Sequence, residues 1–347
     1  MSGAAPDPTR PTPTLSVVVL NYNYARYLPA CLKSILGQTF RDFEVVVVDD
    51  RSTDDSRDVV VPFLSDSRVR LHPNTTNMGF CKSLIAGTEE LTRGEFVTVI
   101  SADDLVQRPD AFERQMALLR AHPETAFCFS AIDLVRGESV VGEHHSFNSE
   151  TVMGSREALH ALLLRGTVWP LHSGTIIRRS AYERAGGYRR DIAIVLDLAM
   201  WLPLTMEGGF AYVPERLYGY RLHEGQMSVA TAKIRANARE VGRVLTDACL
   251  LGQQRGFDTG PLVDTVIGVH LSNTAINEAF TGNRKVALQR WYAAIREWPA
   301  ATAKSRKLWI IAFRATFGDL ATKGASESLR VVKRWLRRPG AEAGPSS

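Results

Sequence analysis

The chain has 347 residues, of which 45% are hydrophobic and 23% charged, an ordinary balance for a soluble globular protein. The formal net charge is +5, from 42 Lys and Arg residues against 37 Asp and Glu residues. No apolar run approaches the roughly 20 residues needed to cross a bilayer, so the composition excludes a protein that spans a membrane by helices.

Positive charge is concentrated near the C-terminus. The segment 304–338 carries a net charge of +8, which leaves about −3 for the rest of the chain. Within it, Trp309, Phe313 and Phe317 recur every four residues, as on one face of a helix. Such a helix either packs its aromatic face on the rest of the protein or lies at the surface of an anionic membrane. No nucleic-acid-binding motif accompanies the charge, so nucleic acid is not an expected partner.

The four cysteines are widely spaced and form no CxxC pair. This predicts reduced, mostly buried thiols rather than a zinc or redox site, and it favours a cytoplasmic protein. The opening stretch MSGAAPDPTRPTPT lacks the basic and apolar regions of a signal peptide. We therefore expect residues 1–13 to be a flexible lead-in.

Up to about residue 131, apolar runs typical of strands alternate with segments of helical periodicity. The expected strands are 15–20, 43–48, 68–72, 96–100 and 125–131. The expected helices are 27–36, 80–91, 109–120, and one that begins after a cap in 52–55 and ends at 64. Strands that alternate with helices indicate an α/β fold with a mostly parallel, Rossmann-like sheet flanked by helices.

The pattern weakens from 133 to 170, where we expect an excursion or loop at 135–150 in which His144 and His145 are solvated. Farther on we expect a strand at 173–177, a helix at 197–206, and two short strands at 210–213 and 217–221. Beyond residue 229 the chain is mostly helical by periodicity.

Two of the predicted strands end in paired aspartates. The run VVVVDD ends in Asp49 and Asp50, and the strand at 96–100 runs into Asp103 and Asp104. In open parallel sheets, ligands bind at the carboxyl ends of the strands. Each aspartate alone could be a helix cap or turn residue. Together they favour a site that holds Mg²⁺ or Mn²⁺ and, through it, a diphosphate.

Several motifs in order make the chain recognisable. The segment SVVVLNYNYARYLPACLKSILGQTFRDFEVVVVDDRSTDDS is followed by NMGFCKSLIAG, RGEFVTVISADDL, SGTIIRRSAYERAGGY, VLDLAMWL and YRLHEGQMS. In order and spacing they resemble family 2 glycosyltransferases of the GT-A fold, over roughly 15–228. The resemblance implies a catalytic domain at 14–229, followed by a helical region at 230–338 and a flexible tail at 339–347.

The resemblance assigns a donor site to the first strand ends. Leu20, Asn21 and Tyr22 match positions that line the nucleotide base and ribose. Asp49 matches the aspartate that hydrogen-bonds the base, commonly uracil, and Asp50 is expected to support the turn or the ribose.

A second motif is expected to bind the diphosphate through a metal ion. Asp103 matches the last carboxylate of the family's DxD motif, which binds that ion, while Ser101 replaces its first aspartate and Ala102 lies between them. Asp104 is expected to orient the following loop. Gly79 matches a glycine of the N-x-G segment, in which Ile85 replaces a frequent Asn.

A third motif implies the catalytic base. In VLDLAMW, Asp197 matches the aspartate that deprotonates the acceptor hydroxyl, and Leu196 replaces the usual glutamate before it. Its alternative role is that of an N-cap for the following helix, and Asp191 is the second candidate for the base.

Later segments are expected to complete the site. Arg221 matches an arginine that can reach the donor phosphates, and His223 matches a ligand of the metal or the phosphate. Trp169, His172 and Ser173 lie where relatives shape the acceptor cleft.

The sequence therefore predicts an inverting glycosyltransferase that uses Mg²⁺ or Mn²⁺ and a nucleotide sugar, with a UDP-sugar as the expected donor. A glycan or lipid-linked molecule of bacterial surface polysaccharide or glycolipid synthesis is the expected acceptor, at the inner face of the cell membrane. One alternative is a sugar-nucleotide-binding protein with impaired catalysis, given Ser101, Leu196 and Ile85. A phosphorelay receiver domain also has acidic strand ends, but it would leave Asp197 and YRLHEGQMS without a role.

Overall fold

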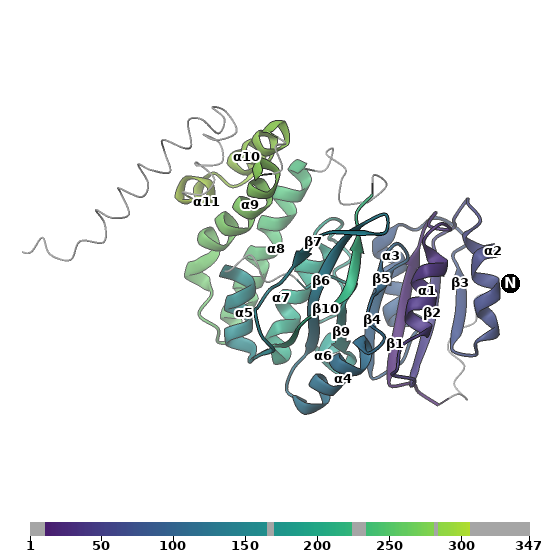
Figure 1. Cartoon of the computed structure of the whole chain (residues 1–347). Coiled ribbons are helices and arrows are strands. Elements are labelled where there is room, and N and C mark those ends of the chain that lie inside the picture. Colours follow the sequence, from purple (N-terminus) through teal and green to yellow (C-terminus); the bar gives the residue numbers. More distant parts are fainter. Residues whose placement is uncertain (1–10, 165–169, 224–233, 281–283, 306–347) are drawn as a thin grey trace, which may run out of the picture.

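The computed structural model describes residues 11–164, 170–223, 234–280 and 284–305 (Figure 1). Within these residues, ten strands form one mixed sheet in the order β3-β2-β1-β4-β9-β6-β10-β5, with β7 beside β6 and β8 beside β10. The strands are β1 (Leu15–Asn21), β2 (Phe43–Asp49), β3 (Val69–Pro73), β4 (Phe96–Ser101), β5 (Leu105–Val106), β6 (Phe127–Arg136), β7 (Ser139–His144), β8 (Thr151–Met153), β9 (Thr175–Arg178) and β10 (Phe210–Arg221).

Helices flank this sheet, as the alternating pattern predicts. They are α1 (Leu28–Leu36), α2 (Ser56–Val60), α3 (Phe80–Ile85), α4 (Ala111–Ala121), α5 (Ser155–Leu164), α6 (Arg179–Arg184), α7 (Leu196–Gly208), α8 (Ile234–Gln254), α9 (Val263–Phe280), α10 (Arg284–Glu297) and α11 (Pro299–Lys304). Helices α8 to α11 lie at the end of the sheet away from β3 and α2 (Figure 1). Among the described residues, no helix is long and apolar enough to cross a membrane.

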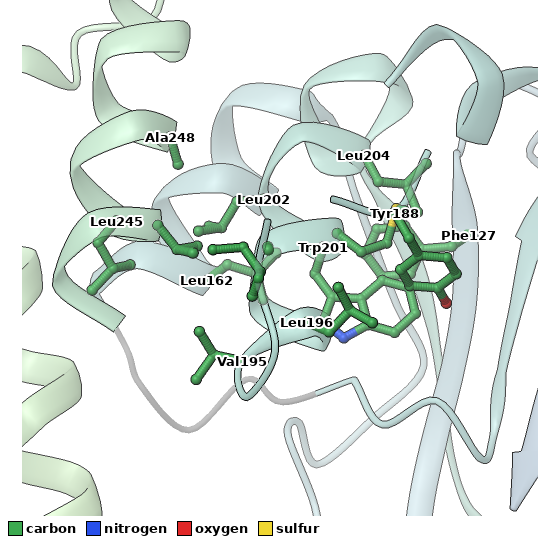
Figure 2. Packing of buried hydrophobic residues seen from close by; sticks show 14 of the residues in the cluster. Phe127, Leu162, Tyr188, Val195, Leu196, Trp201, Leu202, Leu204, Leu245 and Ala248 are labelled. Atoms are coloured by element: carbon green, nitrogen blue, oxygen red, sulfur yellow. The ribbon is translucent and has the colours of Figure 1, made fainter. Parts of the chain in front are cut away.

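Two apolar clusters sandwich the sheet because successive residues of a strand point to opposite faces. On β1, Val17 and Val19 belong to one cluster with residues of α1 and α4. Val18, between them, belongs to the other, with residues of α3, α5, α7 and α8. Figure 2 shows part of the second cluster, in which Trp201 of α7 packs beside Phe127 with ring centroids 5.4 Å apart. Burial on both faces explains the uninterrupted valine runs of β1 and β2.

The carboxyl ends of the parallel strands lie at the same level. In the register of β1 with its neighbours, Asn21 is opposite Asp49, and Leu20 is opposite Ser101. The acidic ends of β2 and β4 therefore meet the end of β1 along one edge of the sheet.

Two later strands bring further residues to the same edge. β9 is antiparallel to both β4 and β6, so the turn that leads into it, Leu171–Gly174, lies beyond the carboxyl end of β4. β10 is parallel to β6 and antiparallel to β5, pairing Gly219 with Leu105. Its last residues therefore lie beside the loop that follows β4.

The loop expected in the stretch 135–150 is wrong for its first part, because residues up to His144 form a β-hairpin. β6 continues to Arg136, turns through Gly137 and Glu138, and returns as β7; β8 and α5 follow. Gly137 has φ 61°, a conformation that suits glycine in a two-residue hairpin turn. His144 pairs with Ile132 at the end of this hairpin, and burial lowers the pKa of its imidazole, so it is not a loop residue in free solvent.

Two other element predictions also need correction. The strands expected at 210–213 and 217–221 are one strand, because register shifts between Val213, Arg216 and Tyr218 let β10 continue past Pro214. The helix expected at 80–91 is α-helical only to Ile85 and continues as a π-helical turn, Ala86–Glu90. A Cβ at Gly87 would lie 2.6 Å from Val18 Cγ1, so this turn packs closely on β1.

Candidate active site

The end of β2 holds a carboxylate that its neighbours fix in place. Asp49 is 1% exposed and accepts hydrogen bonds from Asn21 Nδ2 at 2.9 Å and Arg57 Nε at 2.8 Å. The backbone N–H of Ser52 also donates to it, at 3.3 Å. A carboxylate has about four acceptor positions, so a further donor can still reach Asp49. The amide oxygen of Asn21 is buried and has no hydrogen-bond partner among the described residues.

Asp50 stabilises the loop that precedes α3. Its two oxygens accept hydrogen bonds from Asn74 Nδ2 and from the backbone N–H groups of Met78 and Gly79, each at 2.8 Å. Gly79 has φ 82°, in the left-handed region that favours glycine. This arrangement supports the predicted role of Asp50 in the turn and explains why the loop needs a glycine.

The predicted donor-site residues at the edge differ in exposure. Leu20 and Ala102 are buried, and the Ala102 N–H donates to the Leu20 carbonyl oxygen at 2.9 Å, so they join β1 to the loop after β4. Tyr22 is 45% exposed, which leaves its ring accessible.

Asp103 and His223 come together although 120 residues separate them. His223 Nε2 lies 2.9 Å from Asp103 Oδ2, and both side chains are largely buried. The rings of Tyr24 and Tyr27 pack against the imidazole at centroid distances of 5.5 and 5.2 Å. The sequence analysis did not single out these tyrosines, although an aromatic run directly after a strand end could have indicated them.

Arg221 ties β10 to the acidic loop. Its backbone N–H donates to Asp104 Oδ1 at 3.0 Å, and its Nε donates to the Asp103 carbonyl oxygen at 2.7 Å. Its guanidinium also donates to the Gly137 carbonyl oxygen and lies over the Tyr27 ring, 4.9 Å from the centroid. In this arrangement Arg221 organises the loop that carries Asp103.

Asp104 is a buried carboxylate in an unfavourable electrostatic setting. Burial and the charge of Asp103 raise its pKa to about 7, and hydrogen bonds from Ser173 and the Arg221 backbone partly oppose this rise. Its Oδ1 accepts the Arg221 N–H, so the carboxylate links the acidic loop to the end of β10. Two adjacent carboxylates that repel each other favour the binding of a cation between or beside them.

The turn before β9 touches both sides of the site. Ser173 Oγ accepts a hydrogen bond from the Ser101 N–H at 3.1 Å and is also bonded to the Asp104 carboxyl group. His172, the preceding residue, lies close enough to Asp197 for that carboxylate to raise the pKa of its imidazole, although burial lowers that pKa by more. Of two consecutive residues in this turn, Ser173 therefore contacts the acidic loop and His172 lies within the electrostatic influence of the predicted base.

Asp197 stands in the first turn of α7, and its Oδ1 accepts a hydrogen bond from the Leu198 N–H at 2.8 Å. The N-cap of α7 is Val195, so Asp197 lies inside the first turn and is not the N-cap that the alternative interpretation expected. Asp191 differs: Arg189 donates to both of its oxygens and lowers its pKa to about 2. Such a carboxylate is a weak base, which disfavours Asp191.

Two positions that are polar in the family pattern are core positions here. Ile85 and Leu196 are 5% and 3% exposed and belong to the same apolar cluster (Figure 2 shows Leu196). Neither can supply a polar contact to a substrate. Trp169, the segment 224–228 of the last motif, and the aromatic helix expected around Trp309 lie outside the described residues.

Comparisons with known proteins agree with this geometry. The sequence profile of Glycosyl transferase family 2 matches residues 16–186. EpsE of Bacillus subtilis, a putative glycosyltransferase, is 30% identical over 220 residues, which cover 60% of this chain and 73% of EpsE. The chain belongs to glycosyltransferase family 2.

Two solved glycosyltransferases share the fold of this family 2 glycosyltransferase. Residues 1–349 of TarS from S. aureus match with a TM-score of 0.61 and 15% identity, over 88% of this chain and 92% of that one. TarS has also been solved with UDP-GlcNAc. The mannosyltransferase PcManGT of Pyrobaculum calidifontis, solved with GDP-Man and Mn²⁺, matches with a TM-score of 0.51 and 19% identity, over 91% and 90% of the two chains. The sheet and its flanking helices therefore have the GT-A architecture.

Proposed function

We propose that this glycosyltransferase inverts the anomeric configuration of a sugar as it moves it from a nucleoside diphosphate to an acceptor hydroxyl. The observation that carries the proposal is the turn Leu171–Gly174, in which Ser173 contacts the acidic loop and His172 lies beside Asp197. An inverting transfer needs a leaving-group site and a base on opposite sides of the reacting carbon. The turn joins two groups suited to these roles.

The donor nucleotide is assigned to the ends of β1 and β2. Asp49 keeps a free acceptor position, the amide oxygen of Asn21 has no partner within the described part of the chain, and Tyr22 offers an exposed ring. These groups suit the polar edge and the flat face of a base. A UDP-sugar is the donor that we propose, and the likeness to TarS, which binds UDP-GlcNAc, supports this choice.

Mg²⁺ or Mn²⁺ is the cofactor that we propose. Asp103 and His223 offer an oxygen and a nitrogen ligand 2.9 Å apart. Burial, and after it the charge of Asp103, raise the pKa of Asp104, and a cation nearby would offset the repulsion between the two carboxylates. In the described part of the chain no cluster of three His, Cys, Asp or Glu side chains could hold a metal, so diphosphate oxygens would complete the ligand set. The bound ion would neutralise charge on the leaving diphosphate. The Mn²⁺ in the PcManGT structure supports this assignment.

The residues of this chain supply the proton transfer. As the acceptor oxygen bonds to the anomeric carbon, its proton passes to the Asp197 carboxylate. The bond from that carbon to the diphosphate oxygen breaks, and its electron pair leaves with the nucleoside diphosphate. Displacement from the opposite face gives the inverted product.

We further propose a glycan or lipid-linked acceptor of bacterial surface polysaccharide or glycolipid synthesis, and a cytoplasmic enzyme at the inner face of the membrane. The charge of +8 on 304–338 supports contact with anionic lipids. The full chain and a variant truncated after Ser305 would be compared on liposomes with and without phosphatidylglycerol. Equal binding of both variants would refute the membrane contact.

The function itself is tested by incubating the protein with UDP-, GDP- and dTDP-sugars and Mn²⁺, and by measuring release of the nucleoside diphosphate with and without glycan acceptors. We call this the release assay. The anomeric configuration of the product is then read by NMR. A retained configuration would refute inversion. Binding of a sugar nucleotide without any turnover would favour the catalytically impaired alternative.

A further inference from the structure

Three aromatic side chains near Asp197 carry buried polar atoms that have no hydrogen-bond partner among the described residues. These atoms are His172 Nε2, the Tyr188 hydroxyl and Trp201 Nε1. The His172 ring contacts both others, with centroid distances of 5.5 Å to Tyr188 and 5.7 Å to Trp201. Tyr188 is 3% exposed and Trp201 1% exposed. We call these residues the polar triad.

Such an arrangement is costly for a protein interior. A buried donor or acceptor left without a partner costs about 1–3 kcal/mol, and native structures contain few of them. Tyr182, in the same apolar cluster, has a hydroxyl with hydrogen-bond partners, as is usual for a buried tyrosine. Its hydroxyl donates to Glu89 Oε1 at 2.8 Å and accepts from the Tyr188 N–H at 3.1 Å. Unpartnered atoms on three rings in mutual contact therefore indicate a role other than packing.

The polar triad lies next to the proposed base. Trp201 follows Asp197 by four residues on α7, so both lie on one face of this helix. The Asp197 charge acts on both other rings: it opposes the lowering of the His172 pKa by burial, and it adds to the rise that burial causes in the Tyr188 pKa. Figure 2 shows Tyr188 and Trp201 in the cluster next to Leu196, the residue before Asp197.

We propose that His172, Tyr188 and Trp201 are positioning residues for Asp197, which stabilise its charged carboxylate by hydrogen bonds across an internal water. Tyr188 and Trp201 can donate through O–H and N–H groups, and a neutral His172 can donate through Nε2. These donors would fix the orientation of the carboxylate and keep it ionised, and so able to accept the acceptor's proton, down to a lower pH. Unlike the two-fold guanidinium contact of Asp191, they carry no full positive charge that would make the carboxylate a weak base. The inference rests on the proposed function of Asp197 as the base.

Other charged groups near this site are already paired. Glu89, whose charge also acts on Tyr188, is bonded to Tyr182 and Arg190. Glu240 of α8 accepts the Ile194 N–H at 2.8 Å, just before α7 begins. Neither contact involves the polar triad, so both persist when a triad residue is replaced. A shift in the pH profile of kcat in a triad variant can then be assigned to the polar triad.

The test compares two neighbouring tyrosines, Tyr188→Phe and Tyr182→Phe, in the release assay with the best sugar nucleotide and water or glycan as acceptor. Tyr188→Phe is expected to lower kcat about tenfold, which corresponds to one hydrogen bond. Its donor Kd should be unchanged. The acidic limb of its kcat profile should move up by about one pH unit, because the carboxylate loses a donor that favours its charged form.

Tyr182→Phe is the matched control. It breaks two hydrogen bonds in the same cluster, so we expect a lower unfolding temperature and an unchanged pH profile. If the Tyr188 hydroxyl were only a structural defect, Tyr188→Phe would raise the unfolding temperature and leave kcat and the pH profile unchanged. That result would overturn the inference.

A second triad variant with its own control makes the result independent of how Tyr188→Phe folds. His172→Gln should move the acidic limb in the same direction, whereas His160→Gln should not, although His160 also has a buried, unpartnered Nε2 among the described residues. An unchanged profile in His172→Gln would also overturn the inference. Wild-type turnover in Asp197→Asn would instead refute the proposed base. Turnover lost in Asp197→Asn but unaffected in the triad variants would refute the triad's role alone.

Discussion

The two halves of the sheet build their parts of the site differently. In the half formed by β3, β2, β1 and β4, all neighbours are parallel and their registers run without a shift. In the half formed by β9, β6, β10 and β5, parallel and antiparallel pairs mix, and β10 contains register shifts. The first half presents consecutive strand ends, whereas the second supplies a turn, a strand end and a helix start. In the proposed function, the regular half thus carries the donor site, and the irregular half carries the candidate base and the turn beside it.

Asp103→Ala should have the largest effect, because Asp103 belongs to the first half and pairs with a histidine from the second. We expect the release assay to fall by about 1,000-fold or more, since a ligand of the proposed metal is lost. Calorimetry should show weaker binding of the sugar nucleotide in the presence of Mn²⁺. Asp66→Ala, which removes a surface partner of Arg68, is the control and should behave as wild type. Near-wild-type turnover in Asp103→Ala would contradict the assignment.

Asp197→Asn should lower turnover without lowering donor affinity, and so distinguish the roles of the two halves of the sheet. Loss of a general base typically costs about 100- to 10,000-fold in kcat. Donor affinity should stay near the wild-type value, because the proposed donor site belongs to the other half of the sheet. Kinetics and calorimetry on one preparation would check this. If donor binding fell as far as in Asp103→Ala, the proposed division between the halves would be wrong.

Asp50→Asn should test whether Asp50, at the end of β2 in the regular half, stabilises a loop or contacts the donor directly. Its replacement leaves an amide N–H facing a backbone N–H, so we expect a loss of about 1–3 kcal/mol in the free energy of unfolding. Donor affinity should fall less than in Asp49→Asn. Thermal unfolding and donor titration of both variants would measure this. A larger loss of affinity in Asp50→Asn would make Asp50 the direct donor contact.

Asp191→Asn should have the smallest effect and serves as the counterpart of Asp197→Asn. The Asp191 pKa is lowered to about 2 by Arg189, so its stabilising contribution is present above about pH 4 and is lost as pH falls through about 2. The pair is exposed, so at neutral pH the substitution should cost less than about 1 kcal/mol. Turnover should not change. A large fall in kcat would make Asp191 the base.

The contrast between the halves also explains which predictions from sequence succeeded. The strand ends at Asn21, Asp49 and Ser101 were predictable because buried parallel strands are continuous apolar runs with polar ends. The hairpin of β6 and β7 was missed, although Gly137 marks its two-residue turn, because β7 is largely exposed and has no alternation of apolar and polar residues. The single β10 was missed because Pro214 in a strand suggests a break, and only a bulge allows the strand to continue.

The sequence by itself determined the fold class, the family and the identity of most candidate site residues, because local periodicity and motif order are properties of the chain alone. Tertiary structure decided which distant residues meet. His223 reaches Asp103 because β10 pairs with β5, and Ser173 reaches Ser101 because β9 runs antiparallel to β4. It also decided that Asp50 holds a loop and that Tyr188 and Trp201 keep unpartnered polar atoms near Asp197, within the part of the chain that is described. These outcomes depend on strand direction and on close packing, neither of which has a local signal in the sequence.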